Sequence, residues 1–154
     1  MHPLRQHFEE LISLTDEEFA YIASHFTPLS LKKNDFLLHD NKVVTHEYWV
    51  VKGLLKIYFL DANGKEHIVQ FAMGNWWVTD YQAFFGKKKA TLNIYCLEDT
   101  ELLAITYTDK ENLCADYLNL TPSTAKNVIW GMLLNKGASF PCSVMMLALV
   151  MNSL

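Results

Sequence analysis

Apolar residues recur with two different periods along this chain, and the change of period separates helical segments from strand-forming ones. In the first 26 residues, apolar side chains return every three or four positions, which is the spacing of one helix face. Two such stripes are present: Leu4, Phe8, Leu11 and Ile12, then Phe19, Ile22, Ala23 and Phe26. Thr15 and Glu18 have the spacing of a capping box, so the second helix is predicted to begin after Thr15 and to end at Thr27-Pro28.

From residue 29 the apolar period becomes two, which predicts β-strands. The predicted strands are 36–38, 48–51, 54–60, 67–72, 93–97 and 101–105. The sequence Asp-Ala-Asn-Gly at 61–64 predicts a hairpin with a type I′ turn, because Asn-Gly readily adopts positive φ angles. A second hairpin is expected to turn at residues 98–100. Short strands at this density predict a sandwich, jelly roll or small barrel.

The composition changes near residue 118. Thr108 and Glu111 have the spacing of a second capping box and predict a short helix to residue 117. Residues 118–154 contain no acidic residue and only two lysines. We therefore expect a folded sensor-like domain at residues 1–117. Residues 118–154 are expected to form an atypical apolar helical tail, which is either a dimerisation segment or a truncated remnant.

Composition and charge exclude several classes of protein. Apolar residues make up 51% of the 154 positions and charged residues 19%, which excludes a disordered chain. The net charge is -4 and Arg5 is the only arginine, so this chain is not expected to bind DNA by itself. The longest apolar run, 144–151, is shorter than the ~20 residues of a membrane span. With no signal-peptide pattern and three widely spaced cysteines, a cytoplasmic protein without a membrane partner is expected.

Three segments in a fixed order carry a resemblance to a known family. Residues 48–58 read Tyr-Trp-Val-Val-Lys-Gly-Leu-Leu-Lys-Ile-Tyr, residues 61–66 read Asp-Ala-Asn-Gly-Lys-Glu, and residues 97–105 form a strand pair before a helix. Together they resemble the cyclic nucleotide-binding domain of the cyclic-AMP receptor protein and FNR family of bacterial transcription regulators. The resemblance covers about residues 4–117. It implies a mainly β fold with flanking α helices, a double-stranded β-helix or jelly roll.

The resemblance also implies where a ligand would bind. In that family a Gly-Glu pair binds the ribose hydroxyl, and a later Arg followed by Ser or Thr binds the cyclic phosphate. Thr79 and Asp80 stand at the first position of this cassette, and Ala90 and Thr91 stand at the second. The candidate ligand-binding residues are Thr79, Asp80, Tyr81, Gln82, Ala90 and Thr91. Because Ala90 cannot pair with phosphate, a contact of ~1.5–3 kcal/mol is missing and cyclic AMP is not expected to bind in the usual way.

A regulatory, ligand-sensing domain is therefore the first hypothesis for the function. The family continues into a dimerisation helix and a helix-turn-helix module, but residues 118–154 lack the basic residues such a module needs. We expect a small-molecule ligand and a homodimer formed through the apolar stripe of the tail. No Ser-His-Asp set or nucleophile elbow is present, so an enzyme is not expected. The sequence predicts neither the identity of the ligand nor that of a cofactor.

Two features and the function itself have alternative interpretations. Residues 87–89, three consecutive lysines, either attract an anion or form a solvated turn. The aromatic residues at 76, 77, 81, 84 and 85 either stack on a planar ligand or fill the pocket as core. The alternative function is a cupin-like jelly-roll metal-binding protein or enzyme, which the histidine pattern supports poorly because it contains no His-x-His pair.

Overall fold

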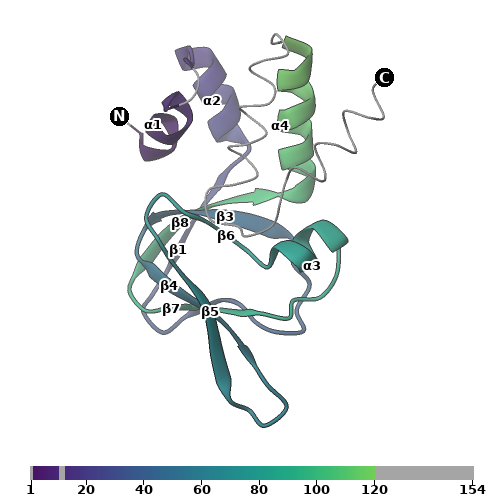
Figure 1. Ribbon diagram of the computed structural model, residues 1–154. Coiled ribbons are helices and arrows are strands. Elements are labelled where there is room, and N and C mark those ends of the chain that lie inside the picture. Colours follow the sequence, from purple (N-terminus) through teal and green to yellow (C-terminus); the bar gives the residue numbers. More distant parts are fainter. Residues whose placement is uncertain (1, 11–12, 121–154) are drawn as a thin grey trace.

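Two antiparallel four-stranded sheets face each other and carry helices at one end (Figure 1). The structure, a computed structural model, describes residues 2–10 and 13–120. The first sheet has the order β1 (Thr27–Leu31), β8 (Thr100–Thr106), β3 (His46–Lys52) and β6 (Trp77–Val78). The second has the order β2 (Phe36–Leu38), β7 (Asn93–Cys96), β4 (Leu54–Leu60) and β5 (Glu66–Met73). The predicted mainly β jelly roll with flanking helices is confirmed.

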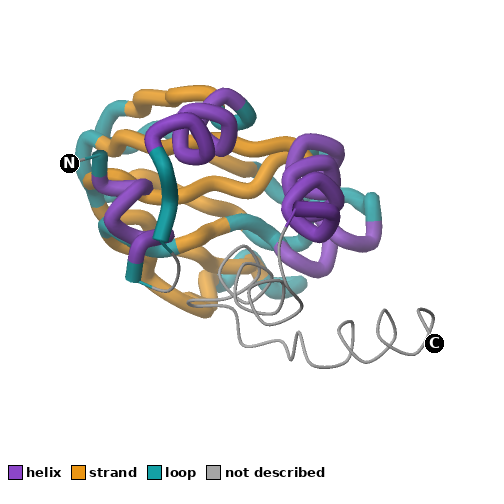
Figure 2. The backbone as a smooth tube through the Cα atoms, turned by 90° about the horizontal axis from the view of Figure 1, so that it is seen from above, coloured by secondary structure: helices purple, strands orange, loops and turns teal. Residues whose placement is uncertain are grey.

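The helices flank this sheet pair. They are α1 (Pro3–Glu9), α2 (Asp16–Ser24), α3 (Tyr81–Gly86) and α4 (Tyr107–Leu120). Helices α1, α2 and α4 lie together over the first sheet, while the β4–β5 hairpin extends from the opposite end of the molecule (Figures 1 and 2). Within residues 2–10 and 13–120, no helix has the length and hydrophobicity to cross a membrane.

The two central strands of the first sheet, β3 and β8, bury side chains on both faces. On β3, Trp49 packs toward the helices, and the next residue, Val50, packs between the sheets. On β8, Leu103 and Ile105 join the helix-side cluster, whereas Leu102 joins the cluster between the sheets. The fold therefore has two cores, and the first sheet separates them.

The capping box at Thr15 is confirmed. The Thr15 hydroxyl accepts from the Glu18 N–H at 3.2 Å, and the Glu18 carboxylate accepts from the Thr15 N–H at 2.8 Å. The capping box predicted at Thr108 is wrong, because α4 begins at Tyr107. Thr106 caps this helix instead: its hydroxyl accepts from the Asp109 N–H at 3.0 Å. Thr106 and Thr108 each have an acidic residue three positions later, at Asp109 and Glu111. Because β8 ends at Thr106, the helix begins directly after it and Thr106 is the capping residue.

The second predicted hairpin is wrong. Strand β7 pairs with β2 and β4, whereas β8 pairs with β1 and β3, so the chain crosses from one sheet to the other at residues 97–99. Both strands direct apolar side chains into the space between the sheets, Cys96 from one side and Leu102 from the other. Two strands that face each other across a core have the same alternation as two strands paired side by side, so the sequence pattern does not separate the two cases.

The predicted first hairpin is present, but its turn is not type I′. Of the described turn residues 61–64, only Gly64 has a positive φ, 76°. The Gly64 N–H donates to the Asp61 carbonyl at 2.9 Å, and the Asp61 N–H donates to the Lys65 carbonyl at 3.0 Å. This is a three-residue loop closed by a left-handed glycine, the next most common hairpin after the two-residue type.

Three short elements were not predicted: β1, β6 and α3. Pro28 lies inside β1, where it is tolerated because β1 is an edge strand of its sheet. Helix α3 begins at its N-cap Asp80 and ends at Lys87, whose φ of 50° is left-handed. Helix α4 runs to Leu120 without a break at residue 117. The rest of the expected tail, residues 121–154, lies outside the described residues.

We predict that Gly53→Ala destabilises the fold strongly. Gly53 links β3 to β4 with a φ of 118°, and a Cβ there would lie 2.5 Å from the Thr100 hydroxyl oxygen. Strain and overlap together should lower the free energy of unfolding by about 2 kcal/mol or more. The matched control is Gly64→Ala, at a positive φ with nothing within 4 Å of the added Cβ, for which about 1 kcal/mol is expected. Equal losses in urea denaturation would contradict the prediction.

Candidate functional site

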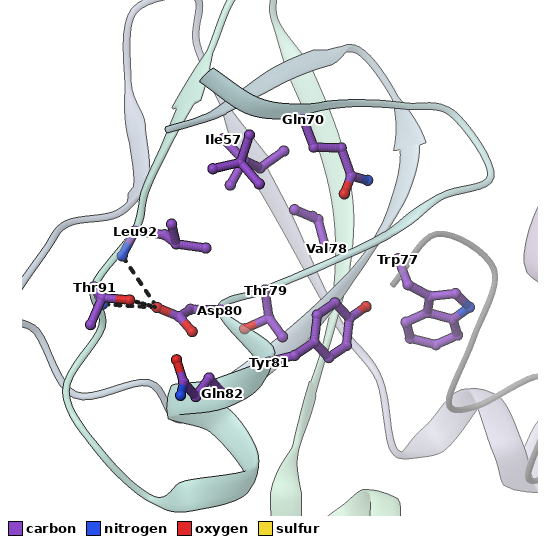
Figure 3. A pocket seen from close by; sticks show the side chains of 11 residues that line it. Ile57, Gln70, Trp77, Val78, Thr79, Asp80, Tyr81, Gln82, Thr91 and Leu92 are labelled. Carbon is purple, nitrogen blue, oxygen red and sulfur yellow. Dashed lines mark hydrogen bonds between the residues drawn. The ribbon is translucent and has the colours of Figure 1, made fainter. Parts of the chain in front are cut away.

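A cavity of about 210 Å³ opens beside α3, between β5 and β6 (Figure 3). Its wall combines Ile57 of β4, Gln70 of β5 and Val78 of β6 with the first residues of α3. Pockets for drug-sized ligands have volumes of roughly 300–1,000 Å³. The cavity is therefore small, with room for a compact molecule.

Five of the six candidate residues from the sequence line this cavity: Thr79, Asp80, Tyr81, Gln82 and Thr91. The sixth, Ala90, is only 2% exposed and packs in the core between the sheets. Its N–H donates to the Lys42 carbonyl at 2.8 Å, and its carbonyl accepts from the Asn41 N–H at 2.8 Å. The position that the resemblance assigns to a phosphate-binding arginine thus holds a small core residue, which is tied by its backbone to a neighbouring segment.

The Asp80 carboxylate is occupied by the protein itself. One oxygen accepts from the Ala83 N–H at 3.1 Å and so caps α3. The other accepts from the Thr91 N–H at 2.8 Å, the Leu92 N–H at 3.2 Å and the Thr91 hydroxyl at 3.3 Å (Figure 3). At 2% exposure, this carboxylate holds two parts of the cavity wall together. Thr79 is similarly engaged, because its hydroxyl donates to the His46 carbonyl at 2.9 Å.

The wall contains no basic side chain among the described residues that line the cavity. Lys87, Lys88 and Lys89 are exposed after α3 and are not part of this wall. The Lys87 ammonium lies 4.9 Å from the centre of the Tyr107 ring. This placement favours the solvated-turn interpretation of the three lysines.

The aromatic residues at 76, 77, 81, 84 and 85 do not all have the same role. Trp77 and Phe84 are 2% and 1% exposed and belong to the two cores. Trp77 also forms part of the cavity wall together with Tyr81. This arrangement favours the interpretation that the aromatic residues fill space around the cavity. Across residues 2–10 and 13–120, no group of three His, Cys, Asp or Glu side chains is close enough to hold a metal ion.

A buried ion pair lies behind the cavity, and the sequence analysis missed it. Glu47 of β3 is 0% exposed and Lys110 of α4 is 3% exposed. The Lys110 ammonium donates to Glu47 Oε2. It also lies 5.6–5.8 Å from the ring centres of Trp77, Phe84 and Phe85, within cation–π range. The available signal was position: Glu47 precedes Trp49 by two residues and so shares its helix-facing side of the strand.

Tyr81 lines the cavity, and Tyr81 and Glu47 each affect the pKa of the other. Burial raises the pKa of Glu47, whereas the charge of Lys110 and hydrogen bonds from Lys110 and Tyr81 lower it. Burial, the negative charge of Glu47 and the hydrogen bond to it raise the pKa of Tyr81 well above its usual value. Tyr81 therefore keeps its proton at neutral pH.

Comparison with known proteins identifies one protein family. The family model for the cyclic nucleotide-binding domain matches residues 28–117. A comparison with curated proteins finds no match.

Solved structures of bacterial regulators have a similar fold. The catabolite activator protein of Thermus thermophilus is 18% identical with a TM-score of 0.65; the match covers 92% of this chain and 61% of that protein, so this chain spans less than two thirds of its length. The sensor domain of the transcriptional regulator DNR from Pseudomonas aeruginosa is 14% identical, with a TM-score of 0.63 and coverage of 90% and 93%. The N-terminal domain of a transcriptional regulator from Streptomyces coelicolor A3(2) is 20% identical, with a TM-score of 0.61 and coverage of 92% and 89%.

We predict that Asp80→Ala destabilises the protein by about 3 kcal/mol, because it removes a buried carboxylate and leaves three backbone N–H groups without their acceptor. Asp80→Asn should fall between the wild type and Asp80→Ala, since an amide offers only one acceptor oxygen. The control is Asp99→Ala: this exposed carboxylate accepts from the Lys33 N–H, and its removal should cause a much smaller loss. Urea denaturation measures all three variants, and a loss for Asp80→Ala no greater than the control's would contradict the prediction.

Proposed function

The chain belongs to the cyclic nucleotide-binding domain family, and we propose that it is a regulatory ligand-sensing domain related to Crp/Fnr-type transcription regulators. We further propose that its cavity does not hold cyclic AMP in the usual way. The match over residues 28–117 supports the first part, and the absence of a basic side chain from the described residues of the cavity wall supports the second.

Among the described residues that line the cavity, a phosphate has no cationic partner. The guanidinium of Arg5, the one arginine of the chain, binds Glu9 at 2.7 Å, Asp16 at 2.5 Å and the Leu14 carbonyl at 3.1 Å, in the α1–α2 region. The carboxylate of Asp80 adds a negative charge to the cavity wall and so disfavours an anion. A compact ligand held by apolar contacts and by hydrogen bonds to groups such as the amides of Gln70 and Gln82 fits this wall better.

The output of the domain is proposed to pass through α4. This helix directly follows β8 and contributes Leu113 to the core under the helices. A ligand that prefers one position of α4 would shift a pre-existing equilibrium between two positions. With a net charge of -4 and no arginine beyond Arg5, the chain is not proposed to bind DNA alone; its output is proposed to reach a second copy or a protein partner.

We predict that cyclic AMP binds no more tightly than adenosine. The two molecules share a base and a sugar, so their difference isolates the phosphate, which finds no cation in the wall. Calorimetric titration of the full chain with each molecule measures this difference. A dissociation constant for cyclic AMP at or below about 10 μM, or an affinity tenfold above that for adenosine, would contradict the proposal.

The second prediction of this function is a homodimer formed through the tail. Val128, Ile129, Met132 and Leu133 share one face of the helix predicted there, outside the described residues. An apolar stripe of this kind is usually covered, and a two-fold pair of copies is the commonest solution. Light scattering after gel filtration should give about twice 17.8 kDa. Ile129→Asp should shift the protein to monomer or aggregate, and a monomeric wild type at high micromolar concentration would rule the dimer out.

A further inference from the structure

We propose that strand β5, at one edge of the second sheet, is an interface between two copies of this chain. In this contact the β5 strands of two copies pair antiparallel and join two four-stranded sheets into one sheet of eight strands. The inference does not rest on the function proposed above, and it uses none of the tail residues of the dimer proposed there.

Large apolar side chains are exposed mainly on the β4–β5 hairpin. Of the nine large hydrophobic residues that are exposed in the described part of the chain, six lie between residues 59 and 73. They are 40–55% exposed: Phe59, Leu60, Ile68, Val69, Phe71 and Met73. The hairpin projects away from α1, α2 and α4, so these three helices do not cover it (Figure 1).

The area of this surface is that of a protein contact. At roughly 150–200 Å² for a fully exposed large apolar residue, six residues that are about half exposed present on the order of 500 Å². A stable complex buries about 800 Å² on each partner, of which somewhat more than half is apolar. The hairpin therefore has the apolar area of one side of such an interface, and exposed patches of this size often mark an interaction site.

The four sheet edges differ in their protection against pairing with another strand. Strand β1 contains Pro28, β6 has two residues and β2 has three, and both prolines and short strands protect an edge. Strand β5 has eight residues, none of them proline. Its last six residues, 68–73, also carry no charge. Among the described strands, β5 is therefore the least protected edge.

Strand β5 has one irregularity, a bulge at Val69. Residues 57 and 58 of β4 pair with Gln70 and Ile68, so Val69 between them has no partner. A bulge twists a strand and disrupts pairing locally. The register is regular from residue 70 to residue 73, so these four residues are the ones that we expect to pair with a second strand.

The chemistry of this edge favours a second copy of the chain as its partner. Two ionisable groups of the hairpin are already engaged, because Glu66 binds Lys56 at 2.6 Å and His67 binds Asp61 at 2.8 Å. An uncharged strand does not repel its own copy. Two identical strands that pair antiparallel are related by a two-fold axis, which is the commonest symmetry of oligomers.

Phe71 is the residue that best reports this contact. It pairs with Lys56 of β4 and is 45% exposed, whereas the next residue, Ala72, is 0% exposed in the core between the sheets. Phe71 therefore points to the outer face of the sheet. A two-fold axis perpendicular to the sheet keeps outward residues on the outer face. Phe71 of one copy thus lies directly opposite Phe71 of the other copy, or diagonal to it.

The first test is a chemical cross-link in the full chain. A short bis-maleimide that spans the ~7–8 Å of a diagonal pair should link Phe71→Cys into a dimer. The control is Val43→Cys, at a residue that is 65% exposed and lies outside the named strands. After subtraction of the wild-type yield, which accounts for the native cysteines, we expect at least fivefold more linked dimer for Phe71→Cys. Equal yields would overturn the proposal.

The second test reverses charge at the same position. Phe71→Lys and Phe71→Glu each place like charges across the axis and should weaken association, whereas an equimolar mixture places opposite charges there. Because the surface is smaller than a standard interface, association is measured by sedimentation equilibrium up to about 500 μM. The mixture should associate at least tenfold more tightly than either variant alone, and a mixture of Val43→Lys with Val43→Glu should show no such gain.

Two results of the second test would overturn the proposal: single Phe71 variants that associate like the wild type, and a mixture that associates no better than its components. The dimer proposed through the tail does not affect this comparison, because it involves residues 128–133 and contributes equally to every variant at position 71. A failure at β5 likewise leaves the mass expected for the tail dimer unchanged. The two proposals therefore fail separately.

Discussion

The buried carboxylate of Asp80 is the contact on which the candidate site depends. It caps α3 on one side and accepts from two consecutive N–H groups before β7 on the other. Without this acceptor, the short helix α3 and the segment at residues 91–92 would have no common anchor, because backbone donors in a buried wall need a partner. The same contact removes Asp80 from the set of groups that a ligand can use freely. The position that the resemblance assigns to a ribose-binding acid therefore has a structural role here.

The described residues of the cavity wall include no basic side chain, because the cations that the structure describes near it are engaged elsewhere or exposed. The one guanidinium of the chain is held by Glu9 and Asp16, and one of its lysines, Lys110, is buried against Glu47. The three lysines after α3 are exposed and do not line the cavity, and an exposed ammonium is strongly hydrated. The chain thus keeps the fold of its family, and the described residues of its cavity wall offer no cation to a ligand. In such a cavity, shape and hydrogen bonding decide which ligand is selected.

The buried pair of Glu47 and Lys110 lies on the helix side of the first sheet, opposite the core between the sheets. This sheet is therefore a shared wall: β3 contacts the second sheet through Val50 and contacts the helices through Glu47 and Trp49. A sheet buried on both faces can pass a displacement from one layer to the other, because close-packed interiors leave little free volume to absorb it.

The sequence by itself determined the fold class, the capping box at Thr15 and the extent of β2 and β4, because these depend on residues close to one another along the chain. The resemblance read from the sequence also named six candidate site residues, and five of them line one cavity. The sixth, Ala90, packs in the core between the sheets. Only the tertiary structure decided that β7 and β8 lie in different sheets, because facing strands and paired strands alternate alike. It alone joined Glu47 to Lys110, two charges 63 positions apart whose burial no local pattern reveals. Local hydrogen bonds and periodicity are encoded within a few residues, whereas the pairing of sheets and the partner of a buried charge depend on which distant segments meet when the chain folds.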